Sequence, residues 1–61
     1  MDAKLLLLAR RLRARADGVL AEAETMQNPN AKRKMLQIAA SYEKLAQQIE
    51  NAATSRDADK A

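Results

Sequence analysis

Apolar residues recur at alternating intervals of four and three through the first 26 positions of the chain. This series consists of Leu5, Ala9, Leu12, Ala16, Val19, Ala23 and Met26. Such spacing places its members on one side of an α-helix and is the heptad pattern of helices that pack side by side. A similar series follows the only proline of the chain and contains Met35, Ile38, Tyr42, Leu45, Ile49 and Ala52. The two series predict two long helices, each with one apolar side.

The segment around Pro29 predicts where the first helix ends and the second begins. Asn28 is a favoured N-cap residue, because its side-chain oxygen accepts a free backbone N–H of the first turn. Proline at the first helical position loses no hydrogen bond, and the residue before a proline avoids the α conformation. We therefore expect helices over about residues 2–27 and 29–53, with Asp2 as the N-cap of the first.

The last eight residues, 54–61, have no apolar periodicity and no large apolar side chain. Segments of this composition bury too little apolar surface to become ordered. We therefore expect a single helical domain over residues 1–53, followed by a disordered polar tail over residues 54–61.

A short connection between two helices makes them antiparallel neighbours, so the sequence predicts an all-α helical hairpin. Large side chains of one helix are expected to meet small ones of the other along a shared seam. The predicted core and self-association seam consists of Leu5, Leu8, Leu12, Val19, Met35, Ile38, Tyr42, Leu45 and Ile49. A chain of 61 residues has a small core, and this one contains no Cys for a disulfide. We therefore expect two copies to dimerise into a four-helix bundle.

Leu6 and Leu7 lie outside this predicted seam. Four consecutive residues advance by about 300° around a helix, so the run Leu5–Leu8 cannot face one side. One interpretation is that both are single leucines on the surface, which are common in folded proteins. The other is that Leu6 and Leu7 form a second contact face for another protein chain.

The chain has 11 Lys and Arg against 8 Asp and Glu. In the predicted hairpin, Glu22 and Glu24 lie beside residues 32–34, so pairing between the helices explains much of the alternating charge. An alternative is a dimeric nucleic-acid-binding protein of the Rop type, a comparison of architecture only. Its predicted phosphate contacts are Arg11, Arg13, Arg15, Lys32 and Arg33. The chain has no arginine-rich block with interspersed aromatic residues that could stack on bases, which argues against this alternative.

The side chains that most often carry catalysis and bind transition metals are absent, because the chain has no His and no Cys. Ser41 falls in mid-helix, where its hydroxyl is expected to bond back to a backbone carbonyl. We therefore expect no enzyme, no cofactor and no metal site. No run approaches the roughly 18 apolar residues of a membrane span, so the expected location is the cytoplasm. A peripheral membrane helix that uses Leu5–Leu8 and the arginines is a further alternative.

Residues 15–50 resemble a group of short, uncharacterised alphaproteobacterial proteins. Their pattern is R-A-x-x-x-x-x-E-A, a proline turn, a basic residue and then LLxIAxxYExLA. The matching residues are Arg15, Ala16, Glu22, Ala23, Pro29, Arg33, Leu36, Ile38, Ala39, Tyr42, Glu43, Leu45 and Ala46. The resemblance implies a helical hairpin and supplies no catalytic or binding residues. The function we expect is that of a small non-enzymatic module, which either associates with itself as a homodimer or interacts with another protein.

Overall fold

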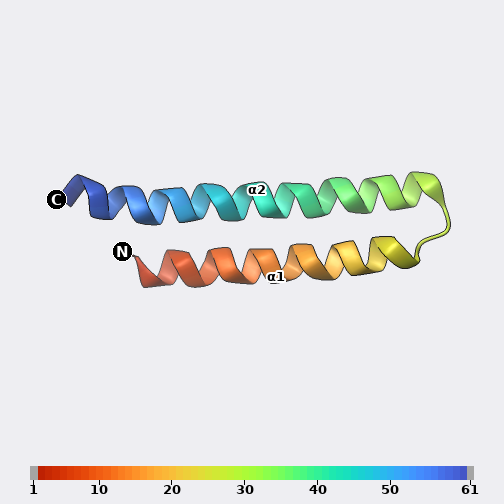
Figure 1. Ribbon diagram of the computed structural model, residues 1–61, viewed down its shortest axis with the longest axis horizontal. Helices are drawn as coiled ribbons and strands as arrows, with labels where there is room; N and C mark the ends of the chain where they lie inside the picture. Colours follow the sequence, from red (N-terminus) through yellow and green to blue (C-terminus); the bar gives the residue numbers. More distant parts are fainter. Residues whose placement is uncertain (1, 61) are drawn as a thin grey trace.

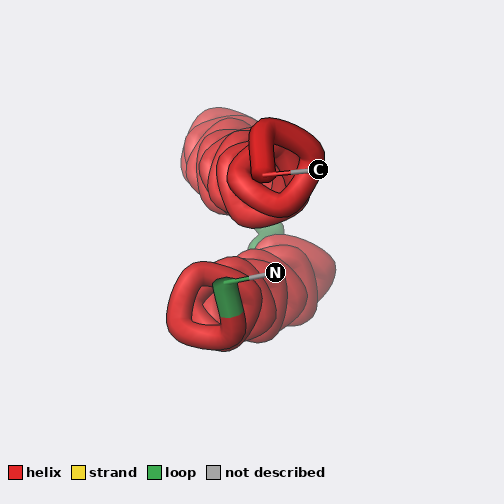
Figure 2. Tube along the Cα trace, turned by 90° about the vertical axis from the view of Figure 1, so that its left-hand side faces the viewer, coloured by secondary structure: helices red, strands yellow, loops and turns green. Residues whose placement is uncertain are grey.

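The computed structural model describes residues 2–60, and it describes the side chains of residues 2–55. It consists of two α-helices, α1 (Ala3–Thr25) and α2 (Pro29–Lys60). The helices lie side by side and run in opposite directions, so the start of α1 and the end of α2 lie at the same end of the hairpin (Figures 1 and 2). The predicted all-α antiparallel hairpin is therefore confirmed.

The first helix begins where its cap residue predicts. Oδ1 of Asp2 accepts the backbone N–H groups of Lys4 at 3.1 Å and Leu5 at 3.2 Å. These are two of the N–H groups that a helix start leaves without a partner inside the helix. At the other end α1 stops at Thr25, slightly before the predicted end, because Met26 is already extended with φ −78° and ψ 134°.

The connection also has the predicted chemistry. Oδ1 of Asn28 accepts the backbone N–H groups of Asn30 at 2.9 Å and Ala31 at 3.2 Å. Pro29 is the first residue of α2, where its missing N–H costs no hydrogen bond. This N-cap fixes the start of α2 so that three residues separate it from the end of α1. Such a short connection forces the two helices to lie next to each other (Figure 1).

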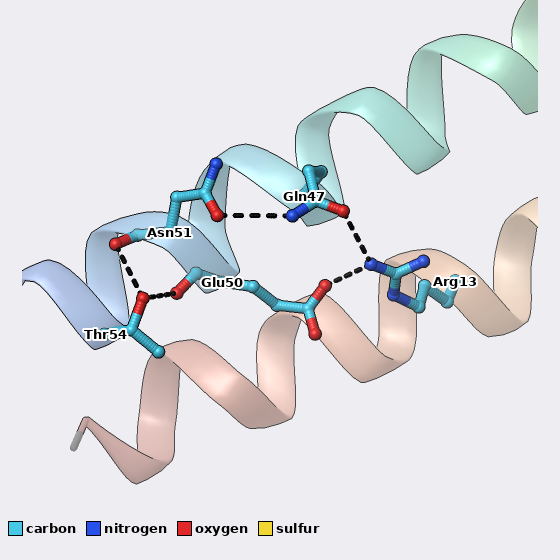
Figure 3. Close-up of polar contacts among 5 residues, drawn as sticks. All are labelled: Arg13, Gln47, Glu50, Asn51 and Thr54. Atoms are coloured by element: carbon cyan, nitrogen blue, oxygen red, sulfur yellow. Dashed lines mark hydrogen bonds and ion pairs between the residues drawn. The ribbon is translucent and has the colours of Figure 1, made fainter.

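The second helix is longer than the sequence predicts. It continues past the expected end at residue 53, through the predicted tail, to Lys60. Residues 54–60 contain neither Gly nor Pro, so no residue in this segment breaks the helix. The hydroxyl of Thr54 bonds back to the carbonyls of Glu50 and Asn51, both at 3.1 Å, within the continuing helix (Figure 3). Residue 61, the last of the predicted tail, lies outside the described residues.

The buried core differs from the predicted seam. Among the described side chains, the residues that are buried are six alanines, each at most 1% exposed. We call them the alanine seam: Ala9, Ala16 and Ala23 in α1, and Ala39, Ala46 and Ala53 in α2. They repeat every seven residues in both helices, so they form one stripe along each. The expectation that large residues fill the space between the two helices is wrong for the single hairpin.

The size of the side chains explains this difference. Where two helices touch closely, only a small side chain fits along the line of contact. Larger side chains move to either side of that line, where a two-helix structure cannot enclose them. Leu8, Ile38 and Leu45, which were predicted as core, are accordingly 44%, 45% and 45% exposed. The hairpin thus has a narrow core of methyl groups and leaves its large apolar side chains partly in solvent.

Candidate self-association surface

One ion pair identifies the two sides of the alanine seam. The guanidinium of Arg13 in α1 pairs with the carboxylate of Glu50 in α2, and it also donates to Oε1 of Gln47 at 3.4 Å (Figure 3). Arg13 comes four residues after Ala9, and Glu50 comes four residues after Ala46. Positions four residues after a seam alanine therefore lie on the same side of the hairpin in both helices. We call the side that carries Arg13, Gln47 and Glu50 the ion-pair face.

The opposite side carries the large apolar residues. At 100° per residue, four residues turn by about 400° and three by about 300°, so these positions flank the seam on opposite sides. Positions three after, four before or one before a seam alanine therefore lie away from the ion-pair face. We call the large apolar residues at these positions the apolar face. They are Leu5, Leu8, Leu12, Val19 and Met26 of the first half, and Met35, Ile38, Tyr42, Leu45 and Ile49 of the second half.

Exposure across the apolar face follows the helical geometry. The members that are three residues after or four before a seam alanine are half-buried, and the three that directly precede a seam alanine are exposed. On α2 the face contains a shallow groove of about 220 Å³, lined by Ile38, Ser41, Tyr42 and Leu45. A groove of this size accepts apolar side chains from a second helix. The structure thus brings all nine residues of the predicted seam onto one face, together with Met26.

The ion-pair face is polar at its centre. The hydrogen bond from Arg13 to Glu50, followed by the charge of Glu50, raises the pKa of Arg13, and the charges of Glu43 and Asp17 act in the same direction. Arg13 consequently remains a cation at every ordinary pH. The middle of this face is therefore polar, whereas Leu6 and Leu36, three residues before a seam alanine, add apolar side chains at its two ends.

Leu6 and Leu7, the predicted second contact face, lie apart from the apolar face. Leu6 comes three residues before Ala9, which places it on the side of the ion pair. Leu6 is half-buried, whereas Leu7 is 48% exposed. The two residues line a groove of about 350 Å³ with Ala3 and Arg10, near the start of α1.

The predicted phosphate contacts do not form one surface. Arg13 is two residues from both Arg11 and Arg15, which is about 200° around α1. Arg13 therefore lies on the opposite side of the helix from these two residues. Arg13 is already paired with Glu50. Lys32 and Arg33 are exposed near the start of α2, next to the connection and away from the middle of α1 (Figure 1). The structure therefore divides these five basic residues among different sides and different ends of the hairpin.

The predicted ion pairs near the connection are also not formed. Among the described side chains, the structure contains no ion pair between Glu22 or Glu24 and the basic residues 32–34. Glu22 and Lys34 are both exposed. Their charges are thus available for contacts outside the hairpin.

The described part of the chain also bears on the predictions about Ser41, metal binding and membrane spans. The hydroxyl of Ser41 donates to the carbonyl of Gln37 at 3.0 Å, which confirms its predicted structural role. The described side chains include no group of three or more carboxylates that could hold a metal ion. Neither helix, over its described residues, is long and apolar enough to cross a membrane. Comparisons of the chain with models of protein families, with curated proteins and with solved structures find no match.

Proposed function

We propose that this protein is a small non-enzymatic helical module that associates with itself through the apolar face. The observation that carries the proposal is the position of ten large apolar side chains on one face, none of them buried by the hairpin itself. Monomeric soluble proteins rarely expose a contiguous apolar patch larger than a few hundred Å². A face of this kind is typical of a surface that another protein covers.

The dimensions of the face suit a second copy of the chain. A helix with the 23 residues of α1 is roughly 35 Å long, and two adjacent helices are roughly 20 Å wide. The face therefore presents roughly 700 Å² on each hairpin, or roughly 1,400 Å² in a dimer. Stable protein interfaces bury about 1,200–2,000 Å² in total. A two-fold dimer also provides a matched partner surface, because each copy presents the same patch to the other.

A four-helix bundle would bury both the seam alanines and the large side chains of the apolar face. In such a bundle each helix contacts two neighbours and points a third side at the centre. The alanine seam joins the two helices of one chain, and the residues three positions after a seam alanine point at the centre. Leu12, Val19 and Tyr42 are among these. The large side chains then form the core of the dimer, which a single hairpin cannot provide.

Sedimentation equilibrium over a range of concentrations tests the proposal. We expect a mass near twice the 6.7 kDa of the chain, and we expect helicity to fall on dilution as the dimer dissociates. The coupling arises because the buried core of the isolated hairpin, among its described side chains, consists only of the alanine seam. A monomer at high micromolar concentration with full helicity would contradict the proposal.

A further inference from the structure

We propose that the two hairpins associate with their connections at the same end of the bundle, so that α1 of each chain packs against α2 of its partner. This inference rests on the proposed self-association. It specifies which helices meet, and it identifies the charged residue of α1 that opposes the alternative arrangement.

Two arrangements bring two apolar faces together with two-fold symmetry. If the connections lie at the same end, α1 contacts the partner's α2. If they lie at opposite ends, α1 contacts the partner's α1, and α2 contacts the partner's α2. All neighbouring helices are antiparallel in both cases, so the helix dipoles do not distinguish them. The side chains that point directly at the partner decide between them.

Those side chains are the ones that directly precede a seam alanine, because they lie about 100° from the seam. On α1 they are Leu8, Arg15 and Glu22, all exposed in the hairpin. On α2 the large ones are Ile38 and Leu45, which are apolar. The helix α1 therefore brings charge into the contact with the partner, and α2 brings apolar surface.

Connections at opposite ends would place like charges together. The midpoint of α1, between residues 3 and 25, is residue 14, so the two-fold axis would pass next to Arg15. Arg15 would then lie against the partner's Arg15, with Arg11 of both chains one turn away. Like charges that face each other across an interface oppose association. No carboxylate at this level of the apolar side of α1 offsets them.

Connections at the same end keep the two Arg15 side chains apart. The Arg13–Glu50 pair places Ala16 level with Ala46 and Ala23 level with Ala39. A two-fold axis along the bundle keeps these levels, so Arg15 lies against the partner's Leu45 and Glu22 against the partner's Ile38. The aliphatic part of Arg15 covers the partner's apolar α2 while its charged end reaches solvent.

Distances between single spin labels test the arrangement. The chain has no Cys, so Gln27→Cys and Ala3→Cys each create one labelling site. Gln27 lies in the connection just after α1, Ala3 is its first residue, and both are exposed. We expect a label-to-label distance of about 20 Å in each dimer, the width of two helices. A 1:1 mixture of the two labelled variants is expected to add a distance of about 40 Å, set by the length of α1. Connections at opposite ends would reverse this result, with long distances in each dimer and a short one in the mixture.

The outcomes separate this inference from the function on which it rests. A mass of one chain, with no intermolecular distance, overturns both. A dimer in which the Gln27→Cys labels lie about 40 Å apart overturns only the arrangement. A dimer with the short distance in each variant, and a distance of about 40 Å in the mixture alone, supports the inference.

Discussion

Leu45→Glu is expected to convert the assembly into monomers and to remove much of its helicity. Leu45 is 45% exposed in the hairpin and lines the groove on α2 with Tyr42. In the proposed bundle this site points at the partner, so the substitution would bury a carboxylate without a partner. An unpaired buried charge costs several kcal/mol, which is enough to dissociate a small dimer. Sedimentation equilibrium and far-ultraviolet circular dichroism measure the two effects.

Leu36→Glu is the matched control for this change. Leu36 is the same residue type in the same helix and is 42% exposed. It comes three residues before Ala39, however, which places it on the side of the ion pair. We expect this variant to keep the mass of a dimer. Equal loss of mass in both variants, or a dimer with Leu45→Glu, would show that the apolar face is not the contact.

The same comparison can be made on α1 with adjacent residues. Leu8 and Leu7 are 44% and 48% exposed, but only Leu8 belongs to the apolar face. We expect Leu8→Glu to dissociate the assembly and Leu7→Glu to leave its mass unchanged. If Leu7→Glu also dissociates it, then the groove near the start of α1 takes part in self-association.

Ala46→Leu is expected to destabilise the hairpin itself. Ala46 is fully buried in the alanine seam, where the two helices approach most closely. A larger side chain there forces the helices apart or into strained rotamers, which costs about 1–3 kcal/mol. For a chain of this size the melting temperature should fall by roughly 5–20 °C. Thermal unfolding followed by circular dichroism measures the change.

Ala40→Leu is the control for the seam variant. Ala40 is the neighbour of the seam residue Ala39 but is exposed, so a leucine there has room. We expect its melting temperature to stay close to that of the unchanged chain. An Ala46→Leu protein that melts at or above that temperature would contradict close packing through the seam.

Local chemistry explains why the helix starts and the connection were predictable. The caps at Asp2 and Asn28 and the proline at position 29 each act within three residues along the chain. Such signals do not depend on how the helices pack. The far end of α2 was not predictable in this way, because residues 54–60 lack apolar periodicity but also contain nothing that stops a helix.

The buried side of each helix could not be derived from heptad spacing alone. An apolar stripe that includes both Ala9 and Leu12 is wide enough to face the other helix of the chain at one edge and a second chain at the other. The sequence did contain a signal, since alanine repeats every seven residues at 9, 16, 23 and again at 39, 46, 53. Matching small residues on two helices favours a close contact between them. The Arg13–Glu50 pair depends on that contact and was not predicted.

The most direct test of self-association through the apolar face uses Tyr42. It is the only aromatic residue of the chain, so its ring protons form a unique signal in nuclear magnetic resonance spectra. Isotope-filtered spectra of mixed labelled and unlabelled chains report only contacts between copies. We predict intermolecular contacts from the Tyr42 ring to methyl groups of Leu12, Val19 or Leu45 of the partner. Intermolecular contacts confined to the ion-pair face, or none in the concentrated protein, would contradict the proposed bundle.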